Sequence, residues 1–343
     1  MINRLLSDLS RLSAALFVAF RAAVSAGCLW AATTSYAVAQ QFHDNKTATQ
    51  LVEGFDAVFG GMHPHARAVH TKGVVVQGAF VPSSSAASLS RAIHLNGGAI
   101  PVIVRFSNFA GVPDIADGAP EASPRGMAIR FQLPDGVDTD IVAHSYNGFP
   151  AATPDDFIGF LHAVAEPETL ATFAKSRPAV QAFLAALKPT PASYATEHYF
   201  GVNAFRFTNT AGLSQYGRYQ LIPMAGEHHL TPEQADQKPK SFLLDELAAR
   251  LASGQVDFHL IVQLAADGDK ISDGSLPWPA DRPTVELGTI TLRTLAPEQV
   301  QIQQMLRFQP TNLVGGIAPS EDPMLLARTQ AYRVSAERRA GPE

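Results

Sequence analysis

The residue pair best suited to chemistry is Arg328 and Tyr332, near the C-terminal end of the chain. Residues four apart on a helix share one face, so the guanidinium can lie against the phenol oxygen and favour its deprotonated form. A phenolate is an anionic ligand that suits ferric iron. Taken by itself, this spacing favours a plainer interpretation, in which a surface arginine lies beside a half-buried tyrosine.

His70 is a second candidate, because it stands just before a predicted strand. Histidine is a common general base, since its unperturbed pKa lies near neutrality, and the mouth of a strand can face a cavity. A lone histidine is nevertheless more often structural, so this segment alone favours a structural role.

Arg105 and Ser107 lie on one face of the next predicted strand, while Val104 and Phe106 lie on the other. An arginine that faces the inside of a barrel needs an anion, because desolvating an unpaired charge is costly. That anion is either a carboxylate of the protein, in an internal salt bridge, or a carboxylate of a bound ligand.

Asn147 follows the end of another predicted strand, and Phe157 and Phe160 follow on a helix. An amide at the end of a strand can orient a small polar substrate, and two phenylalanines can wall an apolar pocket. Taken alone, the segment favours a turn asparagine and two core aromatic residues.

The elements that must position these residues are mainly strands. Eight segments rich in β-branched residues and bounded by turn residues predict strands at 73–81, 101–107, 126–133, 139–144, 203–208, 216–223, 255–265 and 284–294. Mostly short turns favour a closed antiparallel barrel, which leaves no exposed sheet edge, over an open sandwich. The predicted fold is α+β, with an eight-stranded antiparallel β-barrel core, helical insertions and a C-terminal helix.

Helical patterns cover residues 51–59, 161–173, 179–187, 239–253 and 322–339. The insertion that begins near Pro154 is expected to cover one end of the barrel. The last helix is expected to begin at Asp322, a good N-cap, with Pro323 in its first turn.

Composition excludes several classes of function. The formal net charge is -5 and charged residues make up only 17% of the chain, so there is no basic field to hold nucleic acid. The single cysteine, Cys28, excludes an internal disulfide framework and a cysteine-rich zinc site. With 343 residues, 46% of them hydrophobic, the chain can bury a sizeable core.

Residues 1–39 are typical of a signal peptide, with Arg4 and Arg11 followed by apolar stretches and Ala37-Val38-Ala39. Export to the periplasm is the prediction. Arg21 interrupts the apolar stretch, so an uncleaved membrane anchor is less favoured, and a lipid anchor on Cys28 is less favoured still. Residues 40–343 are predicted to form one domain.

In this order, the segments resemble the haem catalases over residues 50–340, and more closely the short catalase-related peroxidases of bacteria. The matching motifs are Arg67-x-x-His70-x-Lys72-Gly73, Val104-Arg105-Phe106-Ser107, Phe308-x-Pro310-Thr311-Asn312-Leu313 with Gly316-Ile317-x-Pro319-Ser320, and Arg328-x-x-x-Tyr332. The resemblance implies a catalase-like haem-binding domain.

The resemblance also implies a role for each matching residue. Tyr332 is the axial ligand of the haem iron, and Arg328 supports its phenolate. His70 is the distal acid–base residue, Ser107 orients it, and Asn147 is the distal amide, in a context that differs from the family's Asn-Asn-Thr-Pro. The other haem contacts implied are Arg67, Arg105 and Arg339 at the propionates, and Phe157 and Phe160 near the distal face.

The implied activity is that of a haem peroxidase that reduces hydrogen peroxide and organic hydroperoxides with a small organic electron donor, and has at most weak catalase activity. Its cofactor is expected to be haem b, and its assembly a monomer or small homo-oligomer. Missing wrapping elements of the large catalases suggest a wider access route to the haem. Two alternatives are a haem hydroperoxide isomerase, similar to allene oxide synthase, and an exported barrel that carries a ligand without catalysis.

Overall fold

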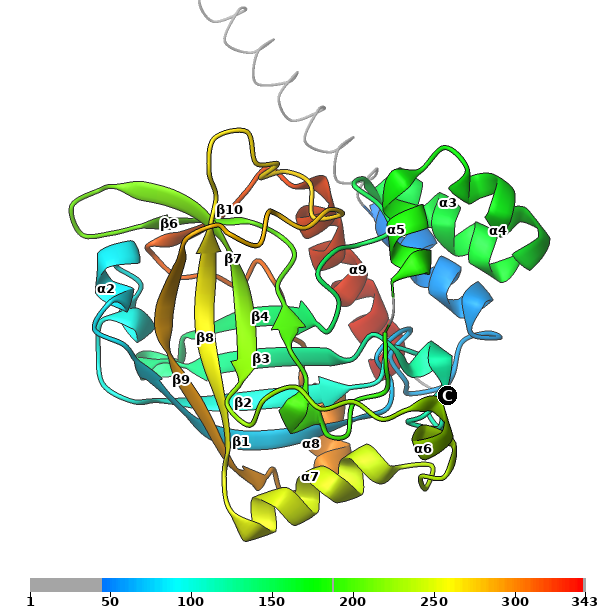
Figure 1. Cartoon of the computed structure of the whole chain (residues 1–343), viewed down its shortest axis with the longest axis horizontal. Coiled ribbons are helices and arrows are strands. Elements are labelled where there is room, and N and C mark those ends of the chain that lie inside the picture. The colour runs from blue at the N-terminus through cyan, green and yellow to red at the C-terminus, as the bar shows by residue number, and fades with distance from the viewer. Residues whose placement is uncertain (1–44, 187, 342–343) are drawn as a thin grey trace, which may run out of the picture. The chain divides into compact units, whose positions relative to one another are not determined.

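An eight-stranded antiparallel barrel is the core of the structure, a computed structural model that describes residues 45–186 and 188–341. Its strands are β1 (Gly73–Pro82), β2 (Ile100–Ser107), β3 (Gly126–Gln132), β4 (Asp138–His144), β5 (Tyr199–Phe200), β7 (Ser214–Pro223), β8 (Val256–Leu264) and β9 (Thr284–Leu295). Pairing of β7 with β8 closes the ring. The predicted fold is therefore confirmed (Figure 1).

One predicted strand is not part of the barrel. The segment predicted at 203–208 is β6 (Phe205–Thr208), which pairs with β7 and with β10 (Ile317–Pro319) outside the closed ring. The barrel strand at this point is β5, which has two residues and bridges β4 to β7. Two residues are too short for an alternating pattern, so the sequence carries no signal for it.

Strands β1 to β4 are covered on both faces in the parts that adjoin the segment after α8. Their inward side chains, such as Val104 and Phe106, join a core that runs around the whole ring. Their outward side chains, such as Val75 and Val142, pack with Leu306 and Phe308 after helix α8 (Gln299–Met305). Arg105 therefore faces outward, under α8, and not into the barrel interior.

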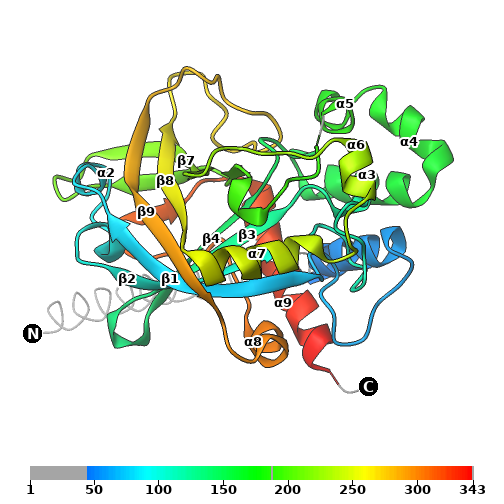
Figure 2. The same cartoon turned by 60° about the horizontal axis from the view of Figure 1, so that its bottom comes forward.

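Helix α7 (Phe242–Ser253) packs its apolar side chains onto the barrel core, and Figure 2 shows it beside β8 and β9. Two short helices lie in loops: α2 (Ala86–Leu89) before β2, and α6 (Pro232–Asp236) before α7. Helix α8 is fixed to β1 through Gln299, whose amide bonds both the N–H and the C=O of Val75, at 2.9 and 2.6 Å.

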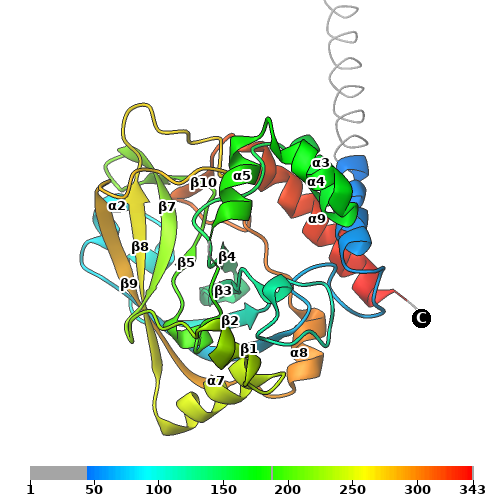
Figure 3. The same cartoon turned by 45° about the vertical axis from the view of Figure 1, so that its right-hand side comes forward.

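The insertion forms three helices, α3 (Pro154–Ala165), α4 (Pro167–Ala174) and α5 (Pro178–Ala185). The helix predicted at 161–173 is divided because Pro167 begins a new one. Apolar residues of α3 and α5 form a separate cluster with the helical residues 47–58 and with α9 (Pro323–Ala340). Figure 3 shows these helices side by side, so the insertion and α9 form one helical layer.

Helix α9 begins as predicted. The Asp322 carboxylate accepts a hydrogen bond from the Met324 N–H at 2.9 Å, and Pro323 occupies the first turn. Among the residues that the structure describes, no helix has the length and apolar character needed to cross a bilayer. The segment 1–39 and the domain boundary predicted at residue 40 lie outside the described residues.

Candidate functional site

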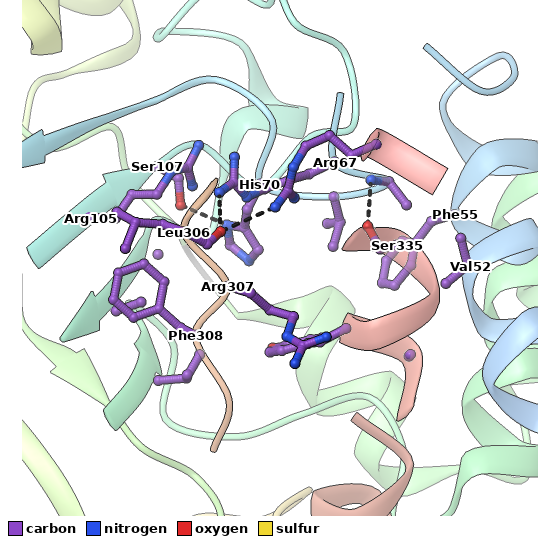
Figure 4. Close-up of a pocket in the computed structure, with 18 of the residues that line it drawn as sticks. Val52, Phe55, Arg67, His70, Arg105, Ser107, Leu306, Arg307, Phe308 and Ser335 are labelled. Carbon is purple, nitrogen blue, oxygen red and sulfur yellow. Dashed lines mark hydrogen bonds between the residues drawn. The ribbon is translucent and has the colours of Figure 1, made fainter. Parts of the chain in front are cut away.

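A cavity lies between the outer face of β2 to β4, helix α9 and the helical residues 47–58. It measures about 820 Å³ including the space open to solvent, which is within the range of small-molecule sites. Figure 4 shows several of its side chains converging on the segment that follows α8. The residues at its wall that matter below are Arg67, His70, Arg105, Ser107, Gly126, Tyr332 and Arg339.

His70 and Ser107 meet on the wall formed by the strands. Ser107 Oγ lies 3.1 Å from His70 Nδ1, within hydrogen-bonding distance. Loss of hydration lowers the pKa of His70 to about 3, helped by the charges of Arg105, His144 and Arg328. The imidazole is therefore neutral near pH 7, and it can accept a proton.

The backbone around His70 is shaped for this contact. His70 has a φ of 58°, which is uncommon for a residue other than glycine, and its N–H bonds to the Phe109 carbonyl at 2.7 Å. Gly126 lies beneath the ring: a Cβ there would be 2.7 Å from Ser107 Oγ and 2.8 Å from His70 Nδ1. Glycine at 126 is what lets the imidazole lie against the sheet.

A buried carboxylate ties together the chain segments that carry these residues. Asp117 bonds Lys72 Nζ at 2.8 Å and the Asn108 amide at 2.7 Å. Asn108 in turn accepts a bond from Arg125 at 2.8 Å. Asn108 adjoins Ser107, Arg125 adjoins Gly126, and Lys72 lies two residues from His70. The network therefore fixes the three segments relative to one another.

Four arginines line the cavity, and none has an acidic partner among the described residues; Arg67, Arg105 and Arg339 are mutual neighbours, and Arg307 adjoins Arg339. Arg67 donates to the carbonyls of Gln303 and Leu306 at 2.7 and 3.0 Å. Loss of hydration and the nearby charges of Arg105 and Arg339 hold the pKa of Arg67 well below its usual range. Three neighbouring cations that repel one another form a site for a ligand with more than one negative charge.

Tyr332 lies on the wall formed by α9, and Arg328 lies one turn before it. Arg328 donates to the phenol oxygen from Nη2 at 2.9 Å and from Nε at 3.3 Å. Its Nη1 donates to the side-chain oxygen of Asn203, whose amide donates to Asp322 at 2.7 Å. A chain of polar contacts therefore runs from the helix N-cap to the phenol oxygen.

Three predicted residues, Phe157, Phe160 and Asn147, are not among the residues that line this cavity. Phe157 and Phe160 belong to the cluster of α3, α5 and α9, where they stack with a centroid separation of 6.1 Å. Asn147 lies in the turn after β4 and does not line the cavity. Contacts of these three residues with a cofactor stay predictions.

Sequence patterns did not single out Asn203, Gln303 or His144. Asn203 contacts Arg328, which is 125 residues away in the sequence, and Gln303 contacts Arg105, which is 198 residues away. No local sequence pattern predicts contacts between such distant residues. The sequence does contain a signal for His144. It lies two residues after Val142 on one strand, so strand alternation places both side chains on the same face of the sheet.

A comparison with protein families identifies the family of the chain. The catalase family model matches residues 49–343. This chain belongs to the catalase family. It is 39% identical over 289 residues to the catalase-related peroxidase of Mycolicibacterium paratuberculosis (strain ATCC BAA-968 / K-10), with 82% of this chain and 91% of that protein covered. It is 32% identical to the catalase-related peroxidase of Synechococcus elongatus (strain ATCC 33912 / PCC 7942 / FACHB-805), with 85% and 88% covered.

Solved catalase structures share the fold. Catalase A from Saccharomyces cerevisiae matches with a TM-score of 0.73 at 21% identity, covering 81% of this chain and 62% of that one. A fungal catalase also matches with a TM-score of 0.73, at 22% identity, covering 81% and 59%.

The family implies haem, and the residues at the cavity fit it. A phenol oxygen held by two guanidinium N–H groups suits an anionic iron ligand. Three arginines without an acidic partner among the described residues suit two propionates. The neutral imidazole of His70 lies on a different wall of the cavity from Tyr332, so one ligand can contact both.

Proposed function

We propose that this protein is a haem peroxidase that reduces hydrogen peroxide and organic hydroperoxides at the expense of an organic electron donor, with at most weak catalase activity. The observation that carries the proposal is one cavity with His70 just before β1, Ser107 at the end of β2, Tyr332 on α9, and neighbouring arginines that lack an acidic partner among the described residues. The two relatives reported above are both named catalase-related peroxidase and are matched over most of their own length, which supports the choice of peroxidase.

The residues act as follows in this proposal. Tyr332 would hold the iron through its phenol oxygen, to which Arg328 donates two hydrogen bonds. Arg67, Arg105 and Arg339 bind the propionates. Haem supplies the redox chemistry when bound.

His70 handles the proton. Its Nδ1 is engaged with Ser107, which leaves Nε2 to take the proton from one peroxide oxygen and deliver it to the leaving oxygen. Each turnover is ROOH + AH2 → ROH + A + H2O, where AH2 is the organic donor. A pKa of about 3 keeps His70 in the proton-accepting form over the physiological pH range.

Several finer features belong to the same proposal. The chain has one cysteine, so a haem held by paired thioether bonds is excluded, which supports haem b. The pattern in residues 1–39 supports export to the periplasm. A monomer or small homo-oligomer and a small aromatic reductant complete the proposal.

The test compares two rates in the pure haem-loaded protein: oxygen release from hydrogen peroxide, and oxidation of an aromatic donor such as guaiacol. Donor oxidation is expected to be the faster of the two. Oxygen release that outpaces donor oxidation would make the protein a catalase. A lipid hydroperoxide converted to an epoxide without any donor would favour an isomerase.

A further inference from the structure

His144 lies on the same face of the sheet as Ser107. In the antiparallel register, Ser107 of β2 pairs with Gly126 of β3, and Gly126 pairs with His144 of β4. Paired residues on neighbouring strands point to the same face of a sheet. The next rung on that face is Arg105, Ala128 and Val142, and all three line the cavity.

The two imidazoles, His70 and His144, are neighbours over Gly126. The missing side chain of Gly126 leaves room there, and a Cβ at this position would meet His70 Nδ1 and Cε1, both at 2.8 Å. His70 therefore lies above the strand that separates Ser107 from His144. After loss of hydration and the charge of Arg105, the charge of His144 lowers the pKa of His70. Loss of hydration and then the charge of Arg328 lower the pKa of His144.

Both ring nitrogens of His144 are buried, and neither has a hydrogen-bond partner in the described part of the chain. An imidazole in its neutral form carries one donor and one acceptor. Leaving both unsatisfied in a protein interior is unfavourable, so such a ring is normally completed by a ligand or an ordered water. Next to His70, that ligand must be small and must both donate and accept hydrogen bonds.

Asn147 does not have this placement. Strand β4 ends at His144, so Asn147 lies three residues beyond the sheet, in a turn closed by the Gly148 N–H and the Tyr146 carbonyl at 3.1 Å. Neither His144 nor Asn147 is among the residues that line the cavity; the strand register places His144, and not Asn147, on the face of Val142, which does line it.

We propose that His144 is the second side chain that binds the peroxide beside His70, in the role that Asn147 was expected to have. This inference rests on the proposed haem peroxidase function. His70 moves the proton from one oxygen to the other, and the N–H of His144 donates a hydrogen bond to the leaving oxygen. That bond stabilises the negative charge that develops there as the O–O bond breaks. The alcohol or water that forms then leaves with the proton from His70.

The test uses four variants of the haem-loaded protein: His144→Leu, His144→Asn, Asn147→Ala and His70→Ala. Cyanide affinity, measured from the haem spectrum, reports hydrogen bonding to a bound ligand without turnover. The second measurement is the rate of reaction with hydrogen peroxide. His144→Leu is expected to weaken cyanide binding about 10-fold or more and to slow the peroxide reaction. His144→Asn is expected to recover most of both losses, and Asn147→Ala to stay within twofold of the wild type.

The thermal midpoint of the haem-free protein separates the proposed role from a structural one. Because leucine removes two unsatisfied polar atoms, the proposal expects His144→Leu to raise this midpoint while it weakens ligand binding. Cyanide affinity and peroxide rate within twofold of the wild type in His144→Leu would overturn the proposal, as would a larger loss in Asn147→Ala. In either case the wild type still forms a haem complex and His70→Ala still loses the peroxide reaction, so the proposed function survives. A wild type that binds no haem overturns both.

Discussion

Alanine at position 126 tests whether the packing of His70 sets the rate of the peroxide reaction. The φ of Gly126 lies outside the left-handed range, so alanine introduces a methyl group without backbone strain. That methyl would lie 2.7 Å from Ser107 Oγ and 2.8 Å from His70 Nδ1. Both atoms belong to the proposed proton-transfer pair.

The expected effect follows from these distances. Ordinary contact begins at 3.4 Å, so the imidazole must move by 3.4 − 2.8, or about 0.6 Å. A misplacement of about 1 Å at reacting groups can lower a rate about 100-fold. A shift of this size should therefore slow the peroxide reaction about 10-fold, and overpacking should lower the free energy of unfolding by about 1–3 kcal/mol.

Stopped-flow measurement of the reaction with hydrogen peroxide, normalised to haem content, checks the rate. Gly98→Ala is the matched control, because a Cβ there meets nothing within 4 Å and its φ is also outside the left-handed range. A Gly126→Ala protein with full haem content that reacts at the wild-type rate would refute the reasoning about His70.

Three further predictions concern other parts of the fold. Asn203→Leu leaves Arg328 and Asp322 without their shared partner, so the free energy of unfolding should fall by about 2–3 kcal/mol; an unchanged thermal midpoint would contradict this. Arg105→Leu should weaken haem binding about 10-fold or more in a haem titration, since a charge-assisted hydrogen bond is lost, and equal affinity would remove Arg105 from the propionate site. Burial lowers the pKa of His94 to about 4, so between pH 6.5 and 4 the unfolded state binds a proton that the folded state does not, and stability falls as the pH falls. Between pH 7 and pH 4, the free energy of unfolding, measured with denaturant, should therefore fall by about 3 kcal/mol less in His94→Leu than in the wild type. Equal falls in the two proteins would contradict the lowered pKa of His94.

The sequence predicted the strands that carry the site because their signals are local. Alternation over residues 101–107 placed Arg105 and Ser107 on one face, and the structure has them on one wall of the cavity. Which face points into the barrel could not be predicted, because β1 to β4 are covered on both sides, by the barrel core and by the segment after α8.

Contacts between distant residues account for what the sequence left out. Strand β5 has two residues and depends on its neighbours for its conformation. The contact between Asn203 and Arg328 joins a loop of the barrel to α9, and no pattern within either segment announces it. His144 was in view as the last residue of a predicted strand, yet its importance depends on Gly126, which lies on the neighbouring strand.

The electronic spectrum of the purified protein, taken for the wild type and for Tyr332→Phe, tests the central claim most directly. The wild type, expressed with sufficient haem, is predicted to show a Soret band with the charge-transfer features of a tyrosinate-ligated ferric haem, and Tyr332→Phe is predicted to lose haem or to change that spectrum. Absence of a Soret band in the wild type, or an identical spectrum in Tyr332→Phe, would contradict the account.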